Sequence, residues 1–160
     1  MILIGIGSNL SGPWGSSLET VGRALNELGR DRLTLLKASR LLMSRPYGNV
    51  HQPAFVNAVA QIATHLPPDA LLSRLHSIER AAGRRRSRRW GPRTLDLDLL
   101  DYHGLVREGR LTLPHPGIAD RLFVLVPLAE ILPRWVHPLR HQTANQLMRR
   151  LGASGEGSEI

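Results

Sequence analysis

Two aspartates within residues 94–100 (TLDLDLL) have the spacing of a metal site. Side chains alternate between the two faces of a strand, so Asp96 and Asp98 should project to one side while the leucines between them point into the core. Two carboxylates on one face repel each other unless a cation lies between them, and such oxygen ligands suit Mg²⁺. An isolated pair of this kind is more often a solvated strand face, so the neighbouring residues have to decide.

An arginine-rich run directly precedes the aspartates, with six arginines in residues 84–93. Guanidinium groups bind phosphate oxygens bidentately and stay charged. Catalysis of phosphoryl transfer is mostly positioning and charge neutralisation, for which Mg²⁺ beside arginines is well suited. A nucleic-acid-binding patch or a solvated basic loop could contain the same run, but neither needs paired carboxylates beside it. The combination favours an enzyme that acts on a nucleoside triphosphate.

Two known phosphate-binding motifs are absent. The opening segment 5–10 (GIGSNL) fails as a dinucleotide fingerprint, because Leu10 occupies the third glycine position and no parallel βαβ repeat follows. The chain also lacks the G-x-x-x-x-G-K-[ST] pattern of P-loop proteins. We interpret the Gly-Ser-Asn turn as structural.

Two aromatic residues and an amide could form a site for a flat heterocycle. Phe55 and Asn57 lie two apart on an expected strand and so share a face, and Phe123 is the only other phenylalanine. Two rings could stack a heterocycle while the amide reads its hydrogen-bonding edge. Each phenylalanine alone is more often a core residue.

The histidines do not have metal-ligand spacing. His115 lies between two prolines, near Thr112 and Arg110. His137 and His141 are four apart, but Pro138 between them argues against a shared helical face.

Composition indicates an ordinary globular protein of 160 residues with 42% hydrophobic residues. No apolar run approaches the roughly 18 residues of a membrane span, and no secretory signal is expected at the start. The absence of cysteine excludes disulfides and thiolate metal sites, so the cytoplasm is the default location. The net charge of +8 should attract polyanions.

The pattern of apolar and turn residues predicts a single domain over residues 1–151 and a flexible tail over 152–160. Strands are expected over 2–7, 33–44, 55–64 and about 94–100, with a loop at 45–53. One helix should begin after Ser16 or Ser17, with apolar positions 18, 21, 25 and 28; a second should run from Pro67-Pro68 to Gly83.

This order predicts an α+β fold with a ferredoxin-like βαββαβ core, in which helices flank an antiparallel sheet on one face. The C-terminal additions are a short strand pair after Gly104, a helix near 122–132 and a last helix near 143–151. Alternation places Asp101 on the opposite face from Asp98, which argues against a third ligand.

The run from Arg89 to Leu100 resembles, position for position, the signature of 6-hydroxymethyl-7,8-dihydropterin pyrophosphokinases. The resemblance extends in the same order over about residues 2–138. Further matching segments are GSNL at 7–10, SRPYG at 44–48, QPAFVNA at 52–58, LL at 71–72, IE at 78–79, GR at 83–84, LPHP at 113–116, RLFVL at 121–125, PL at 127–128 and HP at 137–138.

The resemblance implies transfer of diphosphate from ATP to the pterin hydroxymethyl group, with release of AMP, in folate biosynthesis. Asp96 and Asp98 would hold two Mg²⁺ ions, and Asp98 is a candidate to take the hydroxymethyl proton, although a metal-bound carboxylate is a poor base. Arg84 and Arg93 would stabilise the migrating diphosphate and the leaving AMP. Nucleotide contacts would come from Glu79, Arg86, Trp90, Arg110, Thr112, His115 and Arg121. The pterin would be stacked by Phe55 and Phe123 and read by Asn57 and the backbone near Ser44 and Tyr47.

The resemblance also implies substrate loops that close on ATP, which would correspond to segments 45–53 and 83–92. We expect a monomer that acts on small molecules and binds neither nucleic acid nor membrane. The alternative is an arginine-rich nucleic-acid-binding module, whose polyanion binding would be steeply salt-dependent and indifferent to Mg²⁺.

Overall fold

The computed structural model describes residues 1–44, 54–84 and 94–153. The expected loop 45–53, most of the arginine-rich run and the end of the tail lie outside these ranges. In chain order the elements are β1 (Ile2–Ser8), α1 (Ser17–Glu27), β2 (Thr34–Ala38), β3 (Leu42–Ser44), β4 (Phe55–Ala63), α2 (Pro68–Ala81), β5 (Asp96–Tyr102), the 3-10 helix η1 (Ile118–Asp120), α3 (Leu122–Ile131) and α4 (Ala144–Ala153).

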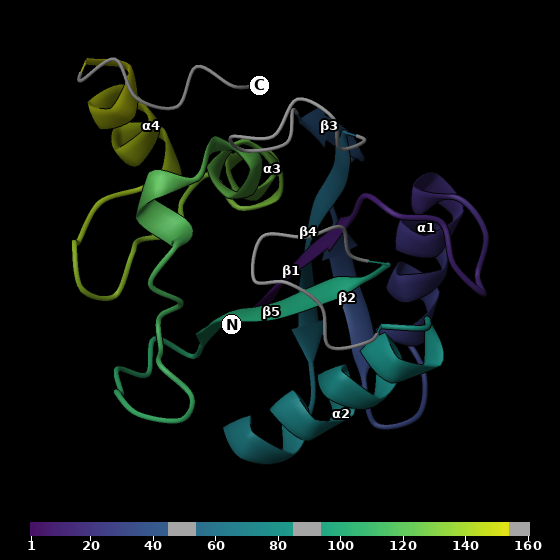
Figure 1. Ribbon diagram of the computed structural model, residues 1–160. Coiled ribbons are helices and arrows are strands. Elements are labelled where there is room, and N and C mark those ends of the chain that lie inside the picture. The colour runs from purple at the N-terminus through teal and green to yellow at the C-terminus, as the bar shows by residue number, and fades with distance from the viewer. Residues whose placement is uncertain (45–53, 85–93, 154–160) are drawn as a thin grey trace.

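The described strands form one antiparallel sheet in the order β2-β4-β1-β5, with β3 also paired to β4 (Figure 1). The chain reaches β2 from β1 through α1 and reaches β5 from β4 through α2. These two interleaved crossovers are the split βαβ arrangement of a ferredoxin-like core. The predicted α+β fold is therefore confirmed.

The alternation of side chains on β1 separates two hydrophobic cores. Ile2, Ile4 and Ile6 pack into a cluster with α1 and α2, whereas Leu3 joins a cluster with α3 and α4. Figure 1 accordingly shows α1 and α2 on one side of the sheet and α3 on the other. The expectation of helices on one face holds for α1 and α2 only, because the C-terminal helices bury the second face.

Two local sequence signals begin and end the helices as predicted. Of the two candidate N-caps of α1, Ser16 is the one used: its hydroxyl accepts from the Glu19 N–H at 3.2 Å, and the Glu19 carboxylate accepts from the Ser16 N–H at 3.2 Å. After α2, Gly83 adopts a φ of +93°, which favours glycine. A Cβ there would also lie 2.5 Å from Cδ of Pro13.

The single strand predicted over residues 33–44 is wrong, because β2 and β3 are separated at Ser39. The Ser39 N–H donates to the Val59 carbonyl at 2.9 Å, and the Ser39 hydroxyl accepts from the Val59 N–H at 2.9 Å. A side-chain oxygen thus replaces a backbone carbonyl, and the ladder resumes only at Leu42, opposite Asn57. The strand pair expected after Gly104 is likewise reduced to one bridge, between Arg107 and Leu113.

The predicted orientation of Asp101 is also wrong. The β1–β5 register shifts between Leu3 and Ile4, so that Asp101 pairs with Leu3 and lies on the α3 side with Asp98. Asp101 is 3% exposed and accepts from the Trp135 indole N–H at 2.8 Å. It therefore connects β5 to the segment after α3 and is not available as a third ligand.

No helix in the described ranges is both long enough and apolar enough to cross a membrane.

The Asp101–Trp135 contact yields a stability prediction. Asp101→Ala should lower the free energy of unfolding by about 1–3 kcal/mol, because the buried indole N–H loses its acceptor. Urea denaturation measures the loss. Asp120→Ala removes an exposed carboxylate paired with Arg150 and should cost less than about 1 kcal/mol. Equal losses in the two variants would contradict the assigned role of Asp101.

Candidate active site

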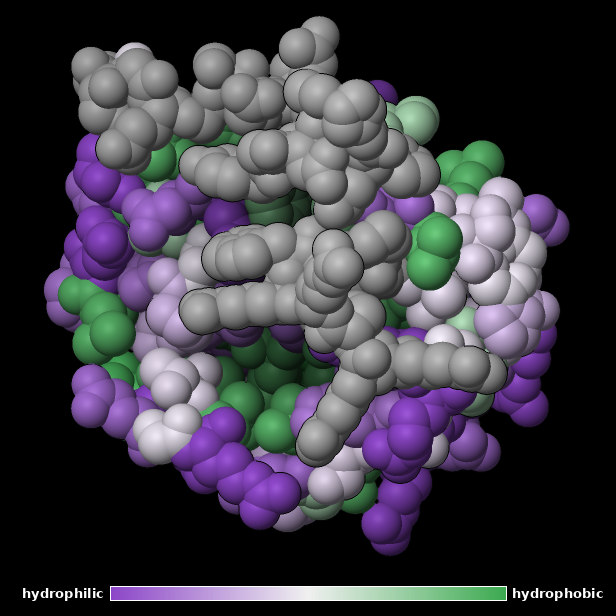
Figure 2. Space-filling model, in the orientation of Figure 1, coloured by the Kyte–Doolittle hydropathy of each residue, from purple (hydrophilic) through white to green (hydrophobic). Residues whose placement is uncertain are grey.

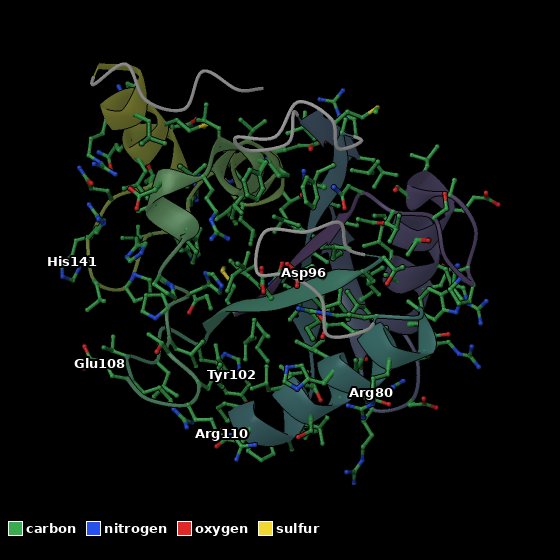
Figure 3. The ribbon with its side chains drawn as sticks, viewed as in Figure 1. Arg80, Asp96, Tyr102, Glu108, Arg110 and His141 are labelled. Carbon is green, nitrogen blue, oxygen red and sulfur yellow. The ribbon has the colours of Figure 1, made fainter. Side chains whose placement is uncertain are left out.

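Asp96 and Asp98 project from β5 on the side of the sheet that faces α3. Leu97 and Leu99, between and after them, are 3% and 2% exposed and pack into the α1–α2 core. The two carboxylates thus share a face, as strand alternation predicts. Figure 3 shows Asp96 near the middle of the molecule, beside the C-terminal end of β1, where it pairs with Gly7.

Arg84 connects Asp96 to a buried carboxylate on α2. One guanidinium nitrogen, Nη1, donates to Asp96 Oδ1 at 2.8 Å and also to Glu79 Oε2. Glu79 is 4% exposed, and the same Oε2 accepts from the Leu97 N–H at 2.7 Å. Burial raises the pKa of Glu79, while the Leu97 N–H and Arg84 oppose that rise. Glu79 therefore holds both Arg84 and the start of β5; its contact with a nucleotide stays a prediction.

The surroundings of Asp98 disfavour its ionised form. Burial, and secondly the neighbouring Asp96 charge, raise the pKa of Asp98 to about 7, although the Arg121 guanidinium acts in the opposite direction. The side chain still keeps 35% of its surface exposed, so it can reach a ligand. A cation bound beside the two carboxylates would therefore stabilise the ionised form of Asp98.

His115 approaches Asp98 with a defined tautomer. The Gly117 N–H donates to Nδ1 of His115 at 3.0 Å, which places the proton of the neutral ring on Nε2. Nε2 lies 3.9 Å from Asp98 Oδ1, and the His115 backbone N–H donates to the Leu100 carbonyl at 2.8 Å. Burial and secondly Arg121 lower the pKa of His115. The ring is thus a neutral N–H donor held against the outer edge of β5.

Those residues expected to bind the pterin that the structure describes lie on the side of the sheet that faces α3. Phe55 and Asn57 are on β4, and Ser44 of β3 pairs with Phe55 through the backbone. Phe123 is in the first turn of α3, partly buried against the α3–α4 core, with the Arg121 guanidinium 5.8 Å from its ring centre. The core interpretation of Phe123 is therefore partly correct, and the side chain remains partly exposed.

The other expected site residues are more scattered. Arg110 is exposed and is seen beside α2, away from Asp96, in Figure 3. The Thr112 hydroxyl donates to the Gly109 carbonyl at 3.3 Å within the same loop. Four of the expected residues lie outside the described ranges: Tyr47, Arg86, Trp90 and Arg93. The side chain of Ser44 is not described either.

One residue near the site is missing from the sequence-based set. His76 on α2 has a lowered pKa because of partial burial and then the charges of Arg84, Arg80 and Arg110. It lies one helical turn before Glu79, a spacing that could have indicated a shared face. The charges of Arg80 and Arg110 thus act on the same part of α2 as Arg84.

A metal at this site would need ligands from a substrate. In the described part of the chain no group of three or more acidic or histidine side chains could enclose a metal ion. Two carboxylates that repel each other nevertheless fit Mg²⁺, which usually completes its shell with phosphate oxygens and water. Figure 2 shows hydrophobic side chains at the bottom of a hollow beside the grey segments.

Comparisons with known proteins give a consistent result. The model of the 7,8-dihydro-6-hydroxymethylpterin-pyrophosphokinase (HPPK) family matches residues 3–133. The 2-amino-4-hydroxy-6-hydroxymethyldihydropteridine pyrophosphokinase of Haemophilus influenzae is 44% identical over 136 residues, which cover 84% of this chain and 83% of the relative. The enzyme of that name from Methylorubrum extorquens is 39% identical over 154 residues, covering 95% and 94%. The folic acid synthesis protein fol1 of Schizosaccharomyces pombe is 36% identical over 95% of this chain, but only 20% of fol1 is matched.

The raised pKa of Asp98 predicts how stability depends on pH. Because the folded pKa is near 7 and the ordinary value is 3.8, the folded protein binds the proton more tightly. The contribution of Asp98 to stability is thus fully present at low pH and is lost as the pH rises towards and past about 7. Asp98→Asn should raise the melting temperature at pH 8 by about 2–4 °C, after discounting for solvent screening, and change it little at pH 4.

Thermal melts without divalent cations test this pH dependence. Asp69→Asn on α2 is the matched control, because that carboxylate is 67% exposed. Equal melting shifts for Asp98→Asn at pH 4 and pH 8 would rule out that burial and the Asp96 charge destabilise the ionised form of Asp98.

Proposed function

The chain belongs to the 7,8-dihydro-6-hydroxymethylpterin-pyrophosphokinase family, and we propose that Asp96, Asp98 and Arg84 form its diphosphate-transfer site. As a member of this family, it transfers diphosphate from ATP to the hydroxymethyl group of 6-hydroxymethyl-7,8-dihydropterin and releases AMP, a step of folate biosynthesis. The arrangement of residues proposed below accounts for how this chain supports that reaction.

The observation that carries the proposal is the pair of carboxylates on one face of β5, with Arg84 Nη1 2.8 Å from Asp96. We propose that Asp96 and Asp98 hold two Mg²⁺ ions, which when bound neutralise charge on the ATP phosphates. Cation binding would offset the effects of burial and of the Asp96 charge, which together raise the pKa of Asp98. Arg84 and Arg93 are proposed to stabilise the migrating diphosphate and the leaving AMP.

The remaining nucleotide contacts are assigned to residues on two sides of β5. His115, with its Nε2 proton, and Arg121 lie near Asp98 and suit phosphate oxygens. Glu79 keeps Arg84 in place from α2. Arg86, Trp90, Arg110 and Thr112 complete the proposed nucleotide side.

The pterin side is proposed to use the α3-facing surface of β4. The rings of Phe55 and Phe123 would stack the heterocycle, and the Asn57 amide with backbone near Ser44 and Tyr47 would hydrogen-bond its edge. The hydroxymethyl oxygen would then attack the β-phosphorus and break the bond between the α-phosphate and the β-phosphate, leaving AMP. Asp98 is the candidate to accept the hydroxymethyl proton, although cation binding would reduce its basicity.

We further propose that the protein is a cytoplasmic monomer that does not bind nucleic acid. No specific observation favours the nucleic-acid-binding alternative over the enzyme. That alternative predicts polyanion binding that survives Asp96→Ala and falls steeply with salt.

The reaction products distinguish the proposed chemistry from its rivals. Incubation with Mg·ATP and the pterin alcohol should form AMP and no ADP; ADP would mean single phosphoryl transfer. Asp96→Ala should lower kcat/KM by about 10³-fold or more, because several kcal/mol of charge stabilisation are lost. Omission of Mg²⁺ should have a similar effect. Glu108→Ala removes an exposed carboxylate far from Asp96 and should leave the rate unchanged (Figure 3). Activity of Asp96→Ala close to that of Glu108→Ala would refute the metal site.

Phe123 provides a separate test of the pterin side. Phe123→Leu keeps most of the apolar packing against the α3–α4 core but removes the ring face. It should weaken pterin binding about tenfold, because stacking on an aromatic ring contributes roughly 1–3 kcal/mol. Calorimetry with a non-hydrolysable ATP analogue should show unchanged nucleotide affinity. Lower thermal stability with normal pterin affinity would leave Phe123 as a core residue only.

A further inference from the structure

Strand β1 has two glycines on the face that carries the candidate site. Gly5 and Gly7 lie on the same side as Leu3, opposite the isoleucines of the α1–α2 core. Gly7 is flanked on both sides by proposed site residues, since it pairs with Asn57 on β4 and with Asp96 on β5. Gly7 therefore lies in the sheet between the residues proposed to bind the pterin and those proposed to bind the metal.

Backbone conformation does not explain the glycine at position 7. The glycines with a positive φ in the described residues are Gly15, Gly83, Gly104 and Gly109, so Gly7 has a conformation open to any residue. Glycine in the interior of a strand also weakens it, and often marks a place where a ligand or another backbone approaches closely.

The space above Gly7 is bounded by residues of the proposed pterin site. A Cβ at Gly7 would lie 3.0 Å from Asn57 Oδ1, and its next nearest neighbours would be Phe55 Cδ1 and the Val56 carbonyl oxygen at 4.0 Å. A Cβ at Gly5, by contrast, would meet side-chain carbons of Leu100 at 3.3 Å and 3.5 Å. The two glycines thus face different surroundings: Gly5 leaves room for a core leucine, whereas Gly7 leaves room for the Asn57 amide, with the Phe55 ring next to it.

The geometry points to Gly7 as a specificity-determining residue, whose missing side chain leaves the volume that the edge of the pterin occupies. This inference rests on the proposed function, because it takes Asn57 and Phe55 as pterin contacts. A methyl group at position 7 would fill part of this volume and press on the amide oxygen that reads the heterocycle. The nucleotide contacts on the outer side of β5, such as His115, do not border this volume.

Gly7→Ala and its neighbour Gly5→Ala form a matched pair for the test. Calorimetry with Mg²⁺ and a non-hydrolysable ATP analogue should show that Gly7→Ala weakens binding of the pterin alcohol about tenfold or more, the size expected for a misplaced methyl group in a fitted pocket. Affinity for the ATP analogue should stay within about twofold of wild type. Gly5→Ala should retain pterin affinity, and its cost should appear in the melting temperature through Leu100.

A second variant keeps the test informative if Gly7→Ala folds poorly. Asn57→Ala removes the atom that a Cβ at position 7 would contact, so the double variant Gly7→Ala/Asn57→Ala should fold. It should bind the pterin several-fold more weakly than Asn57→Ala alone, since the methyl group still occupies substrate volume. Equal affinities of these two variants, or a folded Gly7→Ala with normal pterin affinity, would overturn the inference.

The wild-type measurements separate this inference from the function on which it rests. If the wild-type protein forms no pterin-dependent AMP and binds no pterin, the proposed function fails and the role of Gly7 fails with it. If the wild type binds pterin and Gly7→Ala binds it equally well, only the role of Gly7 is lost.

Discussion

Repulsion between two carboxylates, Asp96 and Asp98, is the constraint on which the rest of the site depends. Burial and the neighbouring charge raise the pKa of Asp98 to about 7, so the folded protein maintains an arrangement that a cation would relieve. Arg84 partly compensates Asp96 and is itself held by Glu79, which also accepts from the backbone of β5. The charge imbalance is thus built into secondary structure, so the proposed site would be organised before a charged substrate binds.

The two faces of strand β1, which is seven residues long, have different surroundings. Its isoleucines bury one face in the α1–α2 core, while Gly5 and Gly7 lie on the other face, below the neighbouring site residues. Because side chains alternate with a period of two, the register that places the isoleucines in the core also places the glycines under the site. A slip of one residue would lose both at once, so packing of the core also fixes the geometry of the proposed site.

Patterns of local origin were predictable from the sequence, and features set by tertiary contacts were not. Strand alternation placed the aspartate pair on one face, and the Ser16 signal located the start of α1. The orientation of Asp101 depends on a bulge and on the distant Trp135, and the break at Ser39 depends on a bond to Val59. The glycine at position 7 looked structural, because only the fold brings its two neighbouring strands beside it. The comparisons establish the family.

The interrupted edge formed by β2 and β3 also affects how the protein behaves at high concentration. A regular outer strand presents a row of unpaired N–H and C=O groups that can recruit a strand from another molecule. Here the register shifts between Leu35 and Lys37, and the ladder breaks again at Ser39. The Lys37 ammonium group lies on this same edge and donates to the Ile131 carbonyl. A bent and charged edge is a poor template for intermolecular sheet growth, so this irregularity protects the chain against aggregation.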